Sequence, residues 1–419
     1  MNRKTAPEFK QAENLDLILP VEVKLENGIS LFWLRDVKDE SVRLDIEWFA
    51  GSKYQDKKLV AGFTNKLLLS GTATKNAREI SEEIDFYGGF VQDECDKDHA
   101  AITLYTLREN FKAVFRVFSD AMLHCEFPEK EFEEERTIAL SKYRIDSDKV
   151  KYVCQRAFNR CMFGEGHPYG KVADEADFIA LTREDLQRYY KAFYLGTKPV
   201  LFLTGNVDEA VIEDLREWSK SISGNEVVYK KETVKPVLGR TEVLRADAIQ
   251  SAIRIGRTAM DKKHPDYFGV QVLDTILGGY FGSRLMANIR EDKGYTYGIG
   301  SAVAVMEDAA YFLISTEVAK EFKENTITEI YAEFDRLKNE LIPADELERV
   351  KNYMLGEFLR QSDGPGAMME SFKNIWFNKL PLSYYTDFIH AINHLTAEEL
   401  QQLAKRYFVK SEMVEVVAG

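Results

Sequence analysis

The last 25 residues of this chain repeat a segment from its middle. LTREDLQRYYKAFYLGTKPVLFLTG, from Leu181 to Gly205, aligns without a gap on LTAEELQQLAKRYFVKSEMVEVVAG, from Leu395 to Gly419, at an offset of 214 residues. Eight of the 25 aligned pairs are identical, and both copies read as a capped amphipathic helix followed by a short apolar strand. Two copies are too few for a solenoid, so the repeat predicts a duplicated domain of about 200 residues.

The sequence around each copy is organised in the same way. Asn27-Gly28 separates two alternating apolar runs, which is typical of a β-hairpin, and apolar and polar residues alternate from Val42 to Trp48. Helical spacing follows, with long helices predicted after Pro128 and after Pro343, two positions 215 residues apart. The two halves therefore predict similar sets of strands and helices.

Strands and helices occur in blocks rather than in strict alternation, which favours an α+β fold. We predict two homologous domains, each a mostly antiparallel sheet with helices packed on one face. The polar stretch SISGNEVVYKKETVK, from Ser221 to Lys235, reads as the linker between them. This places the N-terminal domain at residues 1–222 and the C-terminal domain at residues 223–419.

Composition argues against several classes of function. Asp and Glu outnumber Lys and Arg by 69 to 56, so there is no basic excess with which to bind nucleic acid. No run of about 18 apolar residues occurs, and the amino terminus lacks the apolar run of a secretory signal. The four cysteines form no CxxC pair. We expect a soluble, bacterial-type cytoplasmic chain without a membrane partner, or a periplasmic one if a signal has been removed.

Four stretches match a known family in order and spacing. They are AGFTNKLLLSGT (Ala61–Thr72), Glu135-Arg136, HPYG (His167–Gly170) and GGYFGSRLMANIREDKGYTYGIGS (Gly278–Ser301). Through them the chain resembles, over nearly its whole length, the pitrilysin/insulinase-type (inverzincin) zinc metallopeptidases. The two-domain members of that family include the mitochondrial processing peptidase subunits. The duplicated layout, which rests on the repeat alone, agrees with the resemblance.

The resemblance implies a zinc site whose residues this chain has replaced. In the family the first stretch carries HxxEH, in which two histidines bind zinc and the glutamate activates water, and a later glutamate is the last ligand. The matching histidine positions are Gly62 and Lys66, the glutamate position is Asn65, and the distal position is Lys142. Glycine has no donor atom, an amide is not a base, and two ammonium groups repel a dication. We therefore predict degenerate zinc-site positions and no metal in this chain.

Two alternatives bear on this alignment. A shift of one residue would place Ser141 or Tyr143 at the distal position, and neither is a plausible zinc ligand. The helix could also be unrelated to HxxEH, but the flanking AGxxxxxLxxSGT pattern and the three other matches argue against that reading.

The second domain keeps a pair to which the resemblance gives a catalytic role. Arg290 precedes Tyr297 by seven residues, and in the family an arginine and a tyrosine so spaced reach towards zinc and substrate. A guanidinium and a phenol O–H suit the negative charge that develops on the carbonyl oxygen during amide hydrolysis. The alternative is an Arg290 paired with Glu291 or Asp292 and a tyrosine packed on a strand.

Three weaker signals favour structural roles. Arg284 and the glycines before it suggest a helix end and a surface ion pair, with a chamber wall as the functional alternative. His390 and His394 have the spacing of a helical metal pair, but no third ligand is apparent, which favours a solvated helix face. His167 resembles a family element that orders the loop before the closing helices.

The main hypothesis is a non-zinc-binding subunit of a heterodimeric zinc metallopeptidase. In the family, some members divide the work between a zinc-bearing chain and a chain that supplies the Arg/Tyr pair. The resemblance therefore implies a homologous partner with HxxEH, zinc in that partner, a peptide substrate, and a chamber shared by the two chains. This chain would be inactive alone, where it could form a homodimer.

Two other readings stay open. One is a catalytically inert peptide-binding or scaffold homologue, similar to the respiratory-complex core subunits of the same family. The other is a self-sufficient peptidase that uses His390 and His394. The intact Arg290 and Tyr297 favour the split-site hypothesis over the scaffold, and the lack of an apparent third ligand for His390 and His394 disfavours the self-sufficient peptidase.

Overall fold

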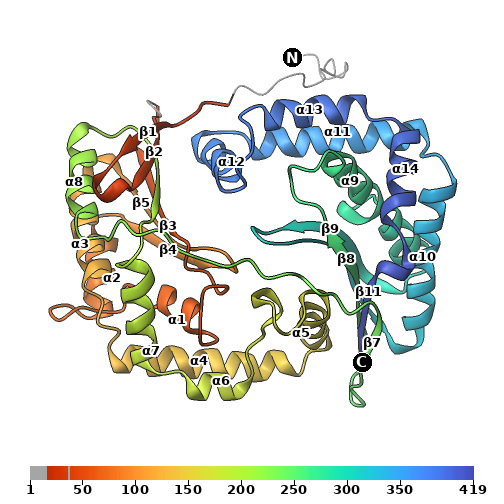
Figure 1. Cartoon of the computed structure of the whole chain (residues 1–419), viewed down its shortest axis with the longest axis horizontal. Coiled ribbons are helices and arrows are strands. Elements are labelled where there is room, and N and C mark those ends of the chain that lie inside the picture. The colour runs from red at the N-terminus through yellow and green to blue at the C-terminus, as the bar shows by residue number, and fades with distance from the viewer. Residues whose placement is uncertain (1–16, 36–37) are drawn as a thin grey trace.

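The computed structural model describes residues 17–35 and 38–419. Two lobes lie side by side, one for each half of the chain, and each is built round its own β-sheet (Figure 1). This confirms the predicted α+β fold, in which both sheets are mixed but mostly antiparallel. Residues 1–16, where the sequence predicts no secretory signal, lie outside the described part. The exact boundary between residues 222 and 223 stays a prediction.

The five strands of the second sheet have the order of five of the six strands of the first, in which β1 is an additional edge strand. The first consists of β1 (Val21–Lys24), β2 (Ser30–Leu34), β3 (Ser41–Trp48), β4 (Phe90–Cys95), β5 (Ala100–Leu107) and β6 (Val200–Thr204), arranged β1-β2-β6-β3-β5-β4. The second consists of β7 (Gly239–Val243), β8 (Gln250–Ala259), β9 (Thr296–Val305), β10 (Ala310–Ala319) and β11 (Val414–Ala418), arranged β7-β11-β8-β10-β9. The repeated strands β6 and β11 occupy matching places, and each pairs in parallel on one side and antiparallel on the other.

The helices follow the same plan. Those of the first half are α1 (Val60–Lys66), α2 (Ala77–Phe86), α3 (Phe111–Leu123), α4 (Glu129–Ser147), α5 (Val150–Phe163), α6 (Glu175–Ala180), α7 (Arg183–Tyr189) and α8 (Glu209–Ser219). Those of the second half are α9 (Tyr267–Asp274), α10 (Lys323–Asn339), α11 (Ala344–Gln361), α12 (Pro365–Phe377), α13 (Tyr384–His394) and α14 (Ala397–Tyr407). Within the described residues, no helix is long and apolar enough to cross a membrane.

Local sequence signals form the elements that they predict. The side chains of Thr182 and Thr396 each accept the backbone N–H of the residue three positions on. The carboxylate of that residue in turn accepts the backbone N–H of the threonine. Both predicted capping boxes are thus present at the starts of α7 and α14. Asn27 and Gly28 both adopt the left-handed conformation, in a turn of Glu26–Gly28 between β1 and β2. The predicted hairpin is present, with a loop one residue longer than a two-residue turn.

Each half also lends one helix to the sheet of the other half. On α5, Cys154 and Phe158 pack with Val414 and Val416 of β11. On α12, Met369 and Phe372 pack with Phe32 and Phe202 on the first sheet. Helices α5 and α12 begin 215 residues apart, like the two halves of the repeat, and both lie between the lobes (Figure 1). The prediction of helices on one face of each sheet was therefore incomplete, because the second face receives a helix from the other domain.

Candidate functional site

Helix α1 carries three of the four positions aligned with the zinc ligands and the general base. Gly62 and Lys66 are one turn apart and both are exposed, whereas Asn65 is buried. Gly62 and Lys66, at positions i and i+4, share one face of the helix, whereas Asn65 turns towards β4 and β5. The exposed face of α1 thus presents a glycine and an ammonium group.

Asn65 is held by three hydrogen bonds inside the first domain. Its Nδ2 donates to the backbone oxygens of Glu94 (2.8 Å) and Ala101 (3.0 Å), and its Oδ1 accepts the Tyr194 hydroxyl (2.9 Å). These bonds join α1 to β4, β5 and the segment after α7. An amide that is only 1% exposed and bonded in this way has a structural role and no access to substrate.

Gly62, Lys66 and Lys142 line one cavity of about 760 Å³. Lys142 reaches it from α4, and Lys66 Nζ also lies 3.1 Å from Asp93 Oδ1 on β4. Three of the four residues that align with the zinc-site positions therefore line the same cavity, although Lys142 is distant from the other two in the sequence. Further walls come from α5 and from the turn between β4 and β5.

The side chains at the four aligned positions do not fit a zinc ion. Two are lysines, one has no side chain, and the amide oxygen of Asn65 already accepts a hydrogen bond. Within residues 17–35 and 38–419, no group of three or more His, Cys, Asp or Glu residues is arranged to hold a metal.

The structure brings Arg290 and Tyr297 together in the second domain. Arg290 lies on the π-helical segment η6 (Met286–Asp292), and Tyr297 is the second residue of β9. The guanidinium carbon of Arg290 is 5.8 Å from the Tyr297 ring centre and 4.7 Å from that of Phe281. These are cation–π distances, so the two aromatic rings hold the guanidinium in place.

Neither polar group of this pair is engaged by the rest of the domain. Tyr297 is 94% exposed, and within the described residues neither its hydroxyl nor the Arg290 guanidinium has a hydrogen bond or an ion pair. The alternative in which Arg290 pairs with Glu291 or Asp292 is not the arrangement seen. The geometry leaves both donors available to a group that approaches the domain from outside.

Tyr297 and the aligned zinc positions line different cavities of the same chain. Tyr297 lines a cavity of about 780 Å³, in which Lys151 of α5 also takes part. The next residue of α5, Tyr152, lines the cavity that contains Lys66 and Lys142. Helix α5 thus contributes to both cavities.

The weaker sequence signals have structural roles. Arg284 forms a bidentate ion pair with Glu346, in which Nε and Nη2 donate to the two carboxylate oxygens at 2.9 and 2.8 Å. His390 and His394 are both exposed and stack on each other at 4.1 Å between ring centres, which agrees with a solvated helix face. His167 Nδ1 accepts the backbone N–H of Tyr169 (3.1 Å), which orders the turn before α6.

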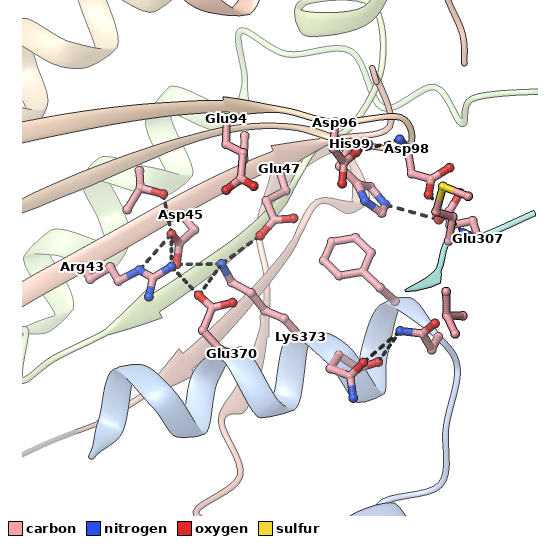
Figure 2. Close-up of a pocket in the computed structure, with 17 residues that line it drawn as sticks. Arg43, Asp45, Glu47, Glu94, Asp96, Asp98, His99, Glu307, Glu370 and Lys373 are labelled. Atoms are coloured by element: carbon pink, nitrogen blue, oxygen red, sulfur yellow. Dashed lines mark hydrogen bonds and ion pairs between the residues drawn. The ribbon is translucent and has the colours of Figure 1, made fainter. Parts of the chain in front are cut away.

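A polar cavity of about 330 Å³ lies between the domains, and the sequence analysis did not find it (Figure 2). Arg43, Asp45 and Glu47 alternate with the apolar residues of β3, so they point to the opposite face of the sheet. Lys373 of α12 reaches that face, with its Nζ 3.0 Å from Asp45 and 2.8 Å from Glu47. Glu370, one turn earlier on α12, contacts Arg43.

A second set of charges closes the other end of this cavity. Buried Lys53 contacts Asp98 of its own domain and both Glu307 and Asp308, which form the turn between β9 and β10. His99 Nε2 is 3.3 Å from Glu307 Oε1 (Figure 2). The alternation along β3 was a signal for this face, but no sequence pattern pointed to Lys373 or to the 307–308 turn.

Burial and ion pairing shift the pKa values of these groups in opposite directions. Burial favours the neutral form of Glu47 and raises its pKa, although the Lys373 ammonium acts in the other direction. Burial also disfavours the charged form of Lys373, but Glu47 and Asp45 outweigh it, and the pKa of Lys373 is raised. Burial is likewise outweighed at Glu307, where bonds from His99 and Lys53 lower the pKa to about 2.

Comparison with protein families matches both halves of the chain. Residues 35–167 match the family described as insulinase (peptidase family M16), and residues 180–354 match the peptidase M16 inactive domain. Together these two matches span most of the sequence.

Individual proteins extend the similarity to nearly the whole chain. A Bacillus subtilis protein named uncharacterized zinc protease YmxG is 23% identical over 402 residues, 94% of this chain and 97% of the relative. A Pseudomonas fluorescens structure, titled peptidase M16 inactive domain, has a TM-score of 0.86 at 22% identity and covers 96% of this chain and 98% of that one. A chain of complex III2 from Candida albicans has a TM-score of 0.71 at 13% identity, with 95% of each chain covered. At these identities the two structures support the fold alone.

Proposed function

Because the chain belongs to the M16 (insulinase) family of peptidases, we propose that it is the non-zinc-binding subunit of a two-chain zinc metallopeptidase. The observation that carries the proposal is the pair of Arg290 and Tyr297. The two donors lie side by side on the surface of the second domain, and the described part of the chain gives neither a polar partner. Donors that need a partner and have none within their own chain suit a substrate held at the interface with another chain.

The proposed division of work follows from the residues at each site. A homologous partner with HxxEH would hold the zinc and supply the general base, whereas Gly62, Asn65, Lys66 and Lys142 offer neither function here. Arg290 and Tyr297 would donate to the peptide carbonyl oxygen as negative charge develops on it. The charge of Arg290 and the hydroxyl of Tyr297 thus act on the transition state more strongly than on the bound peptide.

The chain would also contribute half of a peptide chamber. Strand β4 is at the edge of the first sheet, so its outer backbone groups have no strand beside them in the sheet. An extended peptide can add to such an edge by backbone hydrogen bonds, with its side chains directed alternately into the flanking cavities. The isolated chain is expected to hydrolyse no peptide.

The test uses the complex isolated from its host by a tag on this chain. Arg290→Ala should lower its peptide turnover by about 100-fold or more, because one donor to the developing charge is lost. Turnover is measured with a quenched fluorescent peptide pool after the partner has been identified by sequencing. Arg116→Ala, on the exposed side of α3, is the matched control. An unchanged rate in the Arg290 variant would exclude its proposed role.

The second candidate is a catalytically inert peptide-binding or scaffold homologue. The fold likeness to a chain of a respiratory complex is the observation that favours it. The same native isolation separates the two proposals. A near-equimolar partner of similar size with HxxEH supports the split-site peptidase, whereas a chain recovered alone or with unrelated proteins supports the scaffold.

A further inference from the structure

The cavity that takes the place of the zinc site is lined by six basic side chains. They are Lys58, Lys66, Lys97, Lys142, Arg156 and Lys171. Three of them already have carboxylate partners, because Lys66 is bonded to Asp93, Lys58 to Asp177 and Arg156 to Asp174.

The other three cations have no such partner. Within the described residues, Lys97, Lys142 and Lys171 form no side-chain hydrogen bond or ion pair, although all three line the same cavity. Burial lowers the pKa of Lys97, and the nearby Asp98 and Asp96 only partly compensate for it. A partly buried ammonium without a partner gains free energy when an anion binds beside it.

Carboxylates near the cavity only partly compensate for these cations. Asp96 accepts the backbone N–H groups of Asp98 and His99, both at 2.7 Å, and Asp146 is paired with Lys149. Glu135 is the one remaining acidic residue of this lining, opposite three unpaired lysines. The cavity therefore has an excess of positive charge in a molecule whose net charge is −13.

The cavity also lies where a strand bound to β4 would end. Lys66 lines both this cavity and a second one of about 300 Å³, which includes Phe90, Val91 and Asp93 of β4. Cys95, at the other end of β4, lines the lysine-rich cavity. A peptide that follows the free edge of β4 would pass from the smaller cavity into the larger one.

We infer that this cavity binds the C-terminal carboxylate of a peptide, held by the unpaired ammonium groups of Lys97 and Lys142. The inference rests on the proposed function, since it assumes that peptide runs along β4. Ammonium groups bind a carboxylate by charge-assisted hydrogen bonds, which are stronger than neutral ones. Tyr143 and Tyr152, from α4 and α5, offer aromatic surface to the last side chain. The cavity thus distinguishes a peptide with a free C-terminal carboxylate from one without.

The test measures binding by the purified full chain, without a partner. The probe is a fluorescein-labelled octapeptide of alternating threonine and valine that ends in tyrosine, prepared with a free carboxylate and as the carboxamide. Anisotropy at low salt should give a Kd about 10-fold or more lower for the free acid. A third peptide, the carboxamide with glutamate in place of the penultimate residue, distinguishes a terminal carboxylate from an acidic side chain.

Single substitutions locate the effect. Lys142→Gln and Lys97→Gln should each remove most of the preference for the free acid, whereas Lys191→Gln, an exposed lysine outside the cavity, should leave it unchanged. Equal affinity for acid and carboxamide, no binding of either at 1 mM, or equal gain from the internal glutamate would overturn the inference.

The two proposals can fail separately. If Arg290→Ala leaves both the turnover of the complex and the preference for the free acid unchanged, the carboxylate site is supported and the split-site peptidase is excluded. A complex that loses turnover in Arg290→Ala, but whose isolated subunit binds acid and carboxamide alike, would keep the split site and discard the cavity.

Discussion

At the scale of single residues, the positions that the family resemblance aligns with a zinc site have specific contacts of their own. Asn65 occupies the position of a general base, yet its amide joins α1 to the edge of the sheet by three hydrogen bonds. Lys66 and Lys142 line one cavity, where their positive charges favour an anion over a cation. The physical reason is that an ammonium group attracts a carboxylate and repels a dication.

Asp274 on α9 provides a test of buried charge at this scale. Its side chain is buried, and burial raises its pKa to about 7, while a bond from Ser301 only partly opposes the shift. In the unfolded chain the carboxyl has its ordinary pKa of about 3.9. The folded state therefore holds a proton that the unfolded state has lost, and the free energy of unfolding should fall as pH rises from about 4 to 7.

Asp274→Asn should remove this dependence. The expected gain in the free energy of unfolding at pH 8 is up to about 4 kcal/mol, with little change at pH 4. Urea unfolding followed by tryptophan fluorescence at both pH values measures the difference. Asp363→Asn, an exposed aspartate between α11 and α12, is the control. A variant no more stable than the parent at pH 8 would show that the carboxyl is not destabilising.

At the scale of elements, the two copies of the repeat rely on the same start signal. Thr396 and Glu399 close the first turn of α14 through reciprocal bonds of 3.2 and 2.9 Å. At α7 the corresponding Asp185 also contacts Lys57 and Arg188, and these bonds outweigh burial and lower its pKa to about 2. The capping motif is the same in both copies, but its acidic residue forms additional ion pairs in the first copy.

Thr396→Ala should lower the free energy of unfolding by about 1 kcal/mol, because one backbone N–H loses its acceptor. Thr328→Ala, in the middle of α10, is the matched control. Its hydroxyl only bonds back to the Glu324 carbonyl (2.9 Å), so alanine there should be neutral or slightly stabilising. Thermal unfolding of both variants, followed by circular dichroism, decides the point. Equal losses in the two variants would mean that the cap adds nothing.

At the scale of the whole molecule, the two domains meet through charged side chains and exchanged helices. Lys53 contacts carboxylates of both domains. Lys373 of the second domain contacts Asp45 of the first (Figure 2). Tyr169 adds to this interface between the domains, since its hydroxyl donates to Asp98 and accepts the backbone N–H of Asp308. These contacts, with α5 and α12, fix the spacing of the sheets.

Lys53→Met should destabilise the protein by about 3–5 kcal/mol, since it leaves buried carboxylates without their cation. The lobes should also separate more easily, which small-angle X-ray scattering would detect as a larger radius of gyration. Lys112→Met, on the exposed side of α3, removes one positive charge without touching the interface between the domains. If both variants had the stability and dimensions of the parent, the domains would not depend on this contact.

Local patterns predicted those features that local forces decide. The capping boxes, the Asn27-Gly28 turn and the alternation along β3 each depend on residues a few positions apart, and each is present as expected. The same alternation does not reveal what covers the polar face of β3. Asp45 on that face is only 1% exposed, because it is covered by Lys373, a residue more than 300 positions away. A period of two reveals that a strand has two faces, but it carries no information on what covers them.

The sequence by itself determined the duplication, the α+β class and the chemistry that the four aligned positions lack. Those features follow from periodicity, caps and side-chain type, which act within a few residues or residue by residue. Only the tertiary structure decided that Arg290 and Tyr297 lie together without polar partners, that the lysines share one cavity, and that the halves exchange α5 and α12. Such arrangements depend on contacts between residues far apart in the chain, whose energies arise from burial and charge in the folded state.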